Sequence, residues 1–234
     1  MPSEVRILAV PGIAEVVAGD DVGAIVGDAA SAAGVRVLPG DVVVVAQKIV
    51  SKAEGRVVAA ATRDDVRAVV GREARRILRE TPALLIVETR HGFVCANAGV
   101  DSSNVQTGTV TLLPRDPDAS AARIRTTLEA RCAGRVGVIV SDTFGRAWRH
   151  GQTNVAIGVS GIAPVRDHRG ERDPTGTELK VTEIVHVDEL ASAAELVMRK
   201  LDRVPAAIVR GYDWEPGTQG ATSIVRPPSE DLFR

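Results

Sequence analysis

Aromatic residues, cysteine and net charge are all scarce in this sequence. Only 3% of its 234 residues are aromatic while 44% are hydrophobic, so aliphatic side chains must build the core, which favours mixed helix and sheet. Cys95 and Cys132 are far apart and lack a CxxC partner, which excludes a disulfide framework and a cysteine zinc site. The formal net charge of -1, without a long basic run, argues against a surface for nucleic acid or anionic membranes.

Long apolar runs and targeting signals are also missing. No apolar stretch approaches the roughly 20 residues that span a bilayer, and the N-terminus lacks a basic region followed by an apolar segment. We therefore expect a cytoplasmic protein that binds neither membrane nor nucleic acid, and the cysteine usage fits a reducing compartment. The motifs GxxxxGK[ST], GxGxxG, GxSxG and HExxH are absent, so a nucleotide would need a different cradle.

The residues that are present predict one unit of mixed α and β structure. Short β-branched runs that do not alternate are typical of strands buried on both faces, and runs of apolar residues on one stripe predict amphipathic helices. Strands are expected at residues 5–10, 42–46, 83–87, 93–96, 136–140, 154–165 and 204–209, and helices at residues 21–34, 62–80, 120–134 and 187–202. A loop is expected after the strand at residues 42–46. The candidate helix caps are Asp20 or Asp21, Thr62 in a capping box with Asp65, and Ser120. The helix at residues 62–80 would bury one stripe, formed by Val66, Val69, Val70, Ile77 and Leu78.

The stretch from residue 135 to residue 154 concentrates polar chemistry at the end of a predicted strand. Asp142 and Thr143 follow the apolar run directly, where a carboxylate is well placed to bind a metal ion. Arg146, Arg149 and His150 follow in one predicted loop and could meet phosphate or carboxylate groups. A solvated polar turn is the alternative interpretation of the same residues.

Three further strand ends carry small, amide and charged residues, at Pro11, at residues 47–55 and at residues 97–104. If these strand ends and the one at Asp142 belong to one sheet, their side chains could converge. Asp101 and Asp142 could then share divalent cations, and Lys52 could offset the charge of a phosphate. Solvated lysines and an Asx turn without any ligand remain the alternatives.

The most polar segment, residues 166–183, offers a separate set of possible metal ligands. Asp167, His168, Glu171 and Asp173 lie in it, but acidic and basic residues alternate so evenly that a self-neutralising loop is favoured.

Taken together, VPGI, QKIVSKAEGR, NAGVDSSN, VSDTFGRAWRHG and IGVSGI resemble the coenzyme F420-0:L-glutamate ligase family, over nearly the whole chain and in the same order. These are GTP-dependent enzymes that add γ-linked glutamates to coenzyme F420-0. The resemblance implies an α+β, family-specific ligase fold in an intertwined homodimer. It also implies a reaction through an acyl phosphate, with two divalent cations, Mg²⁺ or Mn²⁺, and allows K⁺.

The resemblance also assigns roles to individual residues. Asp101 and Asp142 would hold one divalent cation, and Thr143 would bind the second. The resemblance assigns no role to Arg146, Arg149 and His150, but their charge makes them candidate catalytic residues that hold the transferred phosphoryl group or the substrate carboxylates. The predicted GTP contacts are Val10, Pro11, Gly12, Ile13, Gln47, Lys52 and Asn104.

This chain departs from the family pattern at two positions. Gln47 stands where a serine is expected, and Lys200 stands where some members carry a glutamate ligand of the second metal. A lysine cannot ligate a metal, so the second site would need water and phosphate oxygens.

We interpret residues 1–225 as the ligase unit and residues 226–234 as a linker-like tail, because actinobacterial relatives often continue into a nitroreductase-like flavin domain. A module that binds guanine nucleotide and coenzyme without ligating them is the alternative function.

Overall fold

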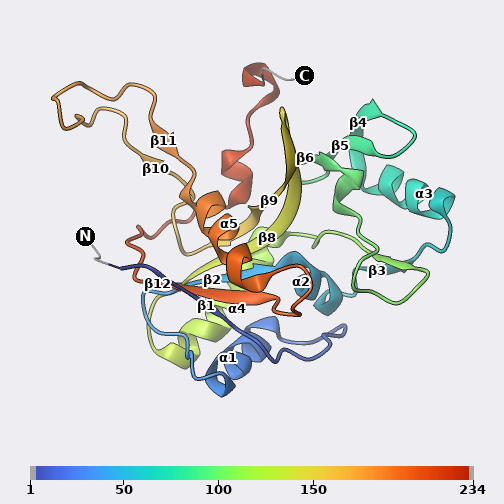
Figure 1. The fold of residues 1–234 in the computed structure, drawn as a ribbon, viewed down its shortest axis with the longest axis horizontal. Helices are drawn as coiled ribbons and strands as arrows, with labels where there is room; N and C mark the ends of the chain where they lie inside the picture. The colour runs from blue at the N-terminus through green and yellow to red at the C-terminus, as the bar shows by residue number, and fades with distance from the viewer. Residues whose placement is uncertain (1–3, 232–234) are drawn as a thin grey trace.

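The fold is built around a five-stranded sheet, seen in a computed structural model that describes residues 4–231 (Figure 1). The strand order is β1-β12-β2-β8-β9. The strands of this sheet are β1 (Arg6–Ala9), β2 (Val42–Ala46), β8 (Gly137–Arg146), β9 (Arg149–Ser160) and β12 (Ala206–Arg210). The helices are α1 (Val22–Ala32), α2 (Gln47–Ala53), α3 (Arg63–Glu73), α4 (Pro117–Cys132) and α5 (His186–Met198).

Strand β2 lies at the centre, and its valines explain why. Val42, Val43, Val44 and Val45 are each 0% exposed, so the strand needs neighbours at both edges and cover on both faces. It pairs in parallel with β8 and antiparallel with β12, and β12 in turn pairs antiparallel with β1. The chain therefore leaves β1, β2 and β8 at the same edge of the sheet.

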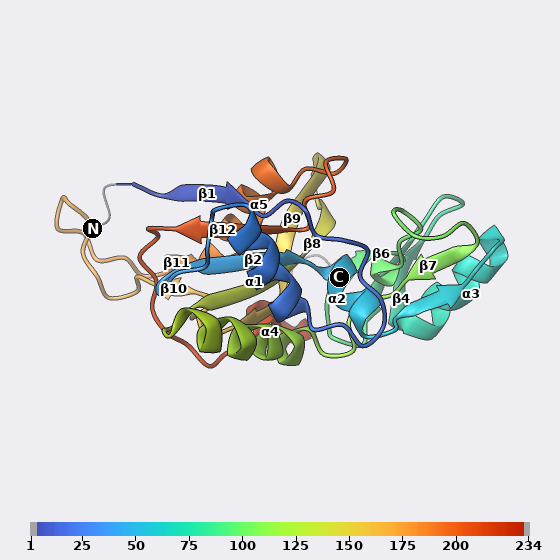
Figure 2. The ribbon, with the colours of Figure 1, turned by 90° about the horizontal axis from the view of Figure 1, so that it is seen from below.

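Helices cover both faces of this sheet (Figure 2). Helices α1 and α4 pack together on one face, whereas α5 lies on the other and contacts β9, β1 and β12. Asp21 caps the start of α1 and Asp116 caps α4, each by accepting a hydrogen bond from a backbone N–H of the first turn. The mixed α and β class expected from the sequence is confirmed.

A smaller body with its own sheets lies beside the main sheet and is drawn in cyan and green in Figure 1. It contains α3, the pair β3 (Val57–Ala59) with β7 (Thr109–Thr111), and a three-stranded sheet. That sheet is formed by β4 (Ala74–Glu80), β5 (Leu85–Thr89) and β6 (Val94–Ala96). Two small clusters of buried aliphatic residues hold it, and β6 contacts β8 of the main sheet.

The helix predicted over residues 62–80 is wrong in its second half. Thr62 caps α3 through a capping box, as the sequence indicated, but the helix ends at Glu73 and the chain continues as β4. Cross-strand pairing with β5 overrides the helical pattern there, and Arg75 and Arg76 of β4 both pair with Glu88 of β5. Ile77, predicted on the buried stripe, is 49% exposed.

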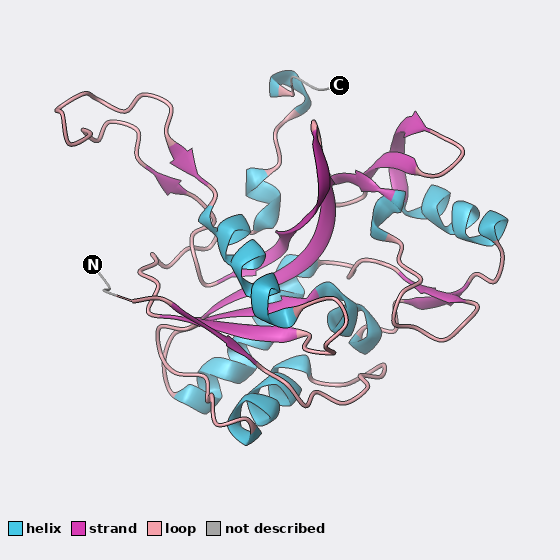
Figure 3. Cartoon of the chain, in the orientation of Figure 1, coloured by secondary structure: helices cyan, strands magenta, loops and turns pink. Residues whose placement is uncertain are grey.

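Three other predicted boundaries need correction (Figure 3). The chain after β2 is not a loop but helix α2, and α4 starts at Pro117 with Asp116 as its cap rather than Ser120, because proline is well tolerated in the first turn. Residues 142–150 are not a loop either, because β8 and β9 pair from Val138 with Ser160 up to the tip, where Arg146 faces Arg149.

The polar segment 166–183 forms an arm with a two-stranded base, β10 (Arg166–Asp167) and β11 (Glu183–Ile184). Arg169 pairs with Asp167 and Glu183, and His168 contacts Glu171. Its charges therefore neutralise one another, which confirms the self-neutralising interpretation. Of the predicted tail, residues 226–231 are described and contain one short turn, η3 (Pro228–Glu230), whereas residues 232–234 lie outside the described part.

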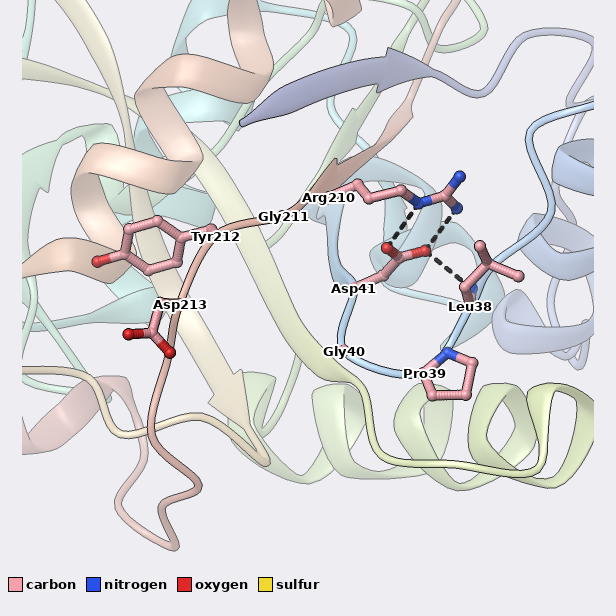
Figure 4. Close-up of a pocket in the computed structure, with 8 residues that line it drawn as sticks. All are labelled: Leu38, Pro39, Gly40, Asp41, Arg210, Gly211, Tyr212 and Asp213. Atoms are coloured by element: carbon pink, nitrogen blue, oxygen red, sulfur yellow. Dashed lines mark hydrogen bonds and ion pairs between the residues drawn. The ribbon is translucent and has the colours of Figure 1, made fainter. Parts of the chain in front are cut away.

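At the edge opposite the ends of β1, β2 and β8, Asp41 anchors the start of β2 to the end of β12. The Asp41 carboxylate is 1% exposed and accepts hydrogen bonds from Nε and Nη2 of Arg210 at 2.9 and 2.8 Å, and from the Leu38 N–H at 2.8 Å (Figure 4). These residues line a pocket of about 360 Å³ together with Tyr212. A buried charge with three donors indicates a structural role.

Replacing Asp41 by alanine tests that role. Asp41→Ala leaves the Leu38 N–H without its acceptor and the Arg210 guanidinium with the Arg36 carbonyl but no neutralising charge, so we expect the free energy of unfolding to fall by on the order of 3 kcal/mol. Urea denaturation followed by circular dichroism measures it. The control Asp28→Ala removes an exposed ion pair with Arg131 and should change stability little. Equal effects of the two variants would contradict the anchoring role.

Candidate functional site

The candidate site lies where β1 and β2 end, beside the middle of β8, which continues beyond Asp142 to Arg146. Pro11 follows β1, helix α2 begins directly after β2, and Asp142 lies on β8. Asp101 comes from elsewhere, because its backbone bridges Thr111 of β7 in the smaller body. The expectation of four exits from one sheet is therefore wrong for Asp101, although its charge does act on Asp142.

Lys48 joins the two bodies at this point. Its Nζ donates to Asp101 Oδ2 at 2.8 Å, to the Ser103 carbonyl at 2.8 Å and to Ser103 Oγ at 2.7 Å. The site residues predicted from the sequence did not include Lys48. Its spacing of four residues from Lys52 could have revealed it, because that spacing places both lysines on one face of a helix.

Asp101 is thereby fixed as a carboxylate. Burial alone would raise its pKa, but hydrogen bonds from Lys48 and Ser103, with the charge of Lys48, hold the pKa below its usual value. The Ser103 N–H donates to Asp101 Oδ1 at 2.7 Å, so the Asx-turn interpretation of this loop is also correct. With Lys48 and Ser103 Oγ on Oδ2, about one lone-pair position of the carboxylate remains.

Asp142 differs from Asp101 in that its pKa is raised rather than lowered. Burial raises its pKa to about 7, and the negative charge of Asp101 adds to the increase, whereas the Thr143 N–H and the charges of Lys200 and Lys48 oppose it. Two neighbouring carboxylates, one of which is costly to ionise, are a donor set that a divalent cation would stabilise. These residues therefore fit the expected metal.

The described residues could not hold a metal by carboxylates alone. Across residues 4–231, no group of three or more His, Cys, Asp or Glu side chains is arranged to bind one. A cation between Asp101 and Asp142 would need oxygens from water or substrate, which is the usual way that Mg²⁺ is bound beside phosphates.

Lys52 and Asn104, both expected to contact nucleotide, are brought together. Lys52 Nζ donates to the Asn104 carbonyl at 2.9 Å and pairs with Glu15, whose side chain is 76% exposed. Asn104 is exposed and has a positive φ of 55°. The loop after β1 and the Asp101 loop therefore meet over α2 through Lys52.

The other predicted nucleotide contacts differ in accessibility. Pro11 and Gly12 are exposed and Ile13 is half-buried, and Gly12 has a φ of +79°, a backbone conformation that favours glycine. Val10 is fully buried and its N–H donates to the Ala206 carbonyl, which leaves only its carbonyl for a ligand. Gln47 is 2% exposed and accepts a hydrogen bond from Ser51 at 2.7 Å.

The candidate catalytic residues Arg146, Arg149 and His150 lie at the exposed tip of the β8–β9 hairpin. Arg146 Nη2 donates to the His150 carbonyl at 3.0 Å. Because Arg146 is four residues beyond Asp142 on an extended strand, its backbone lies roughly 13 Å farther along, at about 3.3 Å per residue. The structure brings these three residues to each other but not to Asp142.

Asp142 interacts electrostatically with Lys200 and with Cys95. The positive charge of Lys200 favours the Asp142 carboxylate. Burial, with the charge of Asp142, raises the pKa of the Cys95 thiol to about 12. Cys95 therefore stays protonated and is not an activated nucleophile.

An α+β fold that presents two carboxylates and two lysines at strand ends, with no activated nucleophile among these groups, is typical of enzymes that act by positioning charged substrates. The profile of the family described as F420-0:Gamma-glutamyl ligase matches residues 12–211. This chain belongs to that family, as its motifs indicated.

Several relatives match over most of their length. The coenzyme F420:L-glutamate ligase of Methanothermobacter thermautotrophicus is 42% identical, covering 98% of this chain and 99% of the relative. The protein of the same name from Methanopyrus kandleri is 43% identical over 98% and 97%, and that from Methanocaldococcus jannaschii is 42% identical over 83% and 85%. Within residues 4–231, no helix is long and apolar enough to cross a membrane.

The raised pKa of Asp142 predicts how pH acts on the metal-free protein. The folded state keeps this proton up to pH of about 7, whereas the unfolded chain loses it near pH 4, so stability should fall as pH rises between these values. Urea unfolding in EDTA at pH 5, 6, 7 and 8 measures the slope.

Two comparisons isolate the contribution of Asp142. Asp142→Asn should flatten the difference in stability between pH 5 and pH 8, and Mn²⁺ should restore stability to the unsubstituted protein at pH 8. An identical pH slope in the two proteins would show that Asp142 is not the group responsible.

Proposed function

We propose that this chain is a GTP-dependent ligase that adds L-glutamate through γ-linkages to coenzyme F420-0, in coenzyme F420 biosynthesis. Membership of the F420-0:Gamma-glutamyl ligase family supports the substrates, because relatives of that name cover nearly all of this chain. The observation that carries the chemistry is the pair Asp101 and Asp142, held beside Lys48.

The reaction would proceed in two steps. A carboxylate oxygen of the coenzyme precursor attacks the γ-phosphorus of GTP, so that the bond to the β-phosphate oxygen breaks and GDP leaves. The amine of glutamate then attacks the acyl phosphate carbon, loses a proton and expels phosphate, which leaves an amide. Both steps require positioning and charge neutralisation rather than a protein nucleophile, in agreement with the protonated state of Cys95.

The residues of this chain have separate parts in the proposal. Asp101 and Asp142 would hold a divalent cation, which would offset the charge on the transferred phosphoryl group. Thr143 would contact a second cation. Lys48 keeps Asp101 ionised and oriented, and Lys52 would exchange its partner Glu15 for a phosphate of GTP.

Arg146, Arg149 and His150 would bind the acidic groups of glutamate or coenzyme. Their distance along the hairpin from Asp142 favours a role at the far end of a long substrate, or in the site of a second copy within the proposed homodimer.

The direct test combines the protein with GTP, Mn²⁺, coenzyme F420-0 and glutamate and follows the coenzyme by mass spectrometry. We expect its mass to rise by glutamyl units, with GDP formed in equal amount. Asp142→Asn should lower the rate by about 100-fold or more while the protein stays folded. Asp28→Asn, on the exposed face of α1, is the matched control.

Two outcomes would contradict the proposal. Coenzyme that is bound but unchanged would support the alternative of a binding module without ligase activity. Full turnover by Asp142→Asn would remove the acidic pair from the mechanism.

Lys52 provides a separate test of the nucleotide site. Lys52→Ala should weaken GTP binding by about 10- to 100-fold, since a charge-assisted hydrogen bond contributes roughly 1.5–3 kcal/mol. Stability should fall by only about 1 kcal/mol, because Lys52, whose side chain is 12% exposed, loses an ion pair to an exposed Glu15 and one hydrogen bond to the Asn104 carbonyl. Calorimetric titration with GTP measures the affinity, with Lys180→Ala on the polar arm as control. Normal affinity with a large loss of stability would make Lys52 a structural residue.

A further inference from the structure

A line of hydrogen bonds runs from Thr143 into helix α5, and none of the roles assigned above uses it. Thr143 of β8 and Asn154 of β9 face each other in the hairpin register, and Thr143 Oγ1 donates to Asn154 Oδ1 at 2.8 Å. Asn154 Nδ2 donates in turn to Glu195 Oε2 at 3.0 Å. Asn154 is 4% exposed, so its amide has protein partners on both sides rather than water.

The direction of this line follows from its last member. An ionised carboxylate can only accept hydrogen bonds, so Glu195 requires the amide nitrogen of Asn154 to face it. The amide oxygen of Asn154 then faces Thr143, and the threonine hydroxyl must donate its proton. Both lone pairs of Thr143 Oγ1 consequently remain available. A reversed amide would donate to the hydroxyl and occupy one of them.

We propose that Asn154 and Glu195 are positioning residues that keep the Thr143 hydroxyl donating into the protein, so that its oxygen can ligate a divalent cation. This proposal rests on the proposed function, because it takes Thr143 as a ligand of the second cation. Thr143 is partly exposed and next to Asp142, so an ion can reach its oxygen beside the candidate site.

Lys200 stands where some family members carry a glutamate ligand of the second cation. The same line of hydrogen bonds would supply a carboxylate near that cation by another route. The carboxylate is that of Glu195, which is linked to Thr143 indirectly, through the side chain of Asn154. Partners that orient a metal ligand in this way typically change metal affinity by 10- to 100-fold when removed.

Ser192 offers a matched control on the same helix. Its hydroxyl donates to the backbone carbonyl of Asn154 at 2.7 Å and contacts Thr153 at 2.8 Å. Ser192→Ala therefore weakens the packing of α5 against β9 without touching the side-chain line from Thr143 to Glu195.

The test is titration of the metal-free full chain with Mn²⁺ in the presence of GDP, which supplies the phosphate oxygens that the second site requires, with free Mn²⁺ measured by electron paramagnetic resonance and the Mn²⁺ bound by GDP alone subtracted. Thr143→Val and Asn154→Ala should each weaken one class of Mn²⁺ sites by about tenfold or more. Glu195→Gln should act in the same direction but less, since glutamine can also donate and no longer fixes the amide. Thr143→Ser and Ser192→Ala should retain binding.

The double variant Thr143→Val with Asn154→Ala decides whether the residues act together. We expect it to bind Mn²⁺ no more weakly than Thr143→Val alone, because Asn154 acts on the cation only through the Thr143 hydroxyl. Additive losses, or equal losses in Ser192→Ala and Asn154→Ala, would overturn the proposal. If Asn154→Ala does not fold, the Mn²⁺ affinities of Glu195→Gln and Ser192→Ala are compared instead.

Mn²⁺ binding also separates this proposal from the proposed function. The expected pattern of Mn²⁺ affinities without any ligation of glutamate would support the positioning role and contradict the ligase activity. Ligation of glutamate, together with Mn²⁺ binding that Thr143→Val does not weaken, would support the ligase activity and contradict the positioning role.

Discussion

The parallel pairing of β2 with β8 is the constraint on which the rest of the structure depends. Four consecutive valines of β2 are fully buried, so this strand can exist only between two neighbours and beneath helices on both faces. Parallel pairing sends β2 and β8 out of the sheet at the same edge. Helix α2 and Asp142 therefore meet there, and Lys48 extends from α2 to the smaller body.

The two carboxylates at this edge differ because only one of them has a cation as a hydrogen-bond donor. Lys48 contacts Asp101 at 2.8 Å, whereas Lys48 and Lys200 act on Asp142 only through their charges. Asp101 is thus held ionised by the protein, while Asp142 is easily ionised only when another positive charge arrives. For the cation of the proposed mechanism, that asymmetry would favour binding and release together with substrate over permanent retention as a structural metal.

The sequence allowed prediction of those features that depend on local patterns. The valine run of β2, the Asp21 and Thr62 helix caps and the Asx turn at Asp101 follow from burial and short-range hydrogen bonding. Features set by distant partners could not be predicted. The change from α3 to β4 depends on pairing with β5, and the origin of Asp101 outside the main sheet depends on its bridge to Thr111. Helix α2, in which Gln47 is 2% exposed, was not predicted either.

The continuation of β8 beyond its apolar run changes the interpretation of the site most. A loop at Asp142 and Thr143 would leave both side chains free to move, whereas a hairpin fixes each opposite a known residue, Val155 and Asn154. Successive residues on a strand point to opposite faces. Thr143 points toward α5, where Asn154 links it to Glu195, and Asp142 therefore points to the other face of β8. In the proposed mechanism, one rigid strand would therefore present the two candidate cation ligands on different faces, each supported by a different layer of the fold.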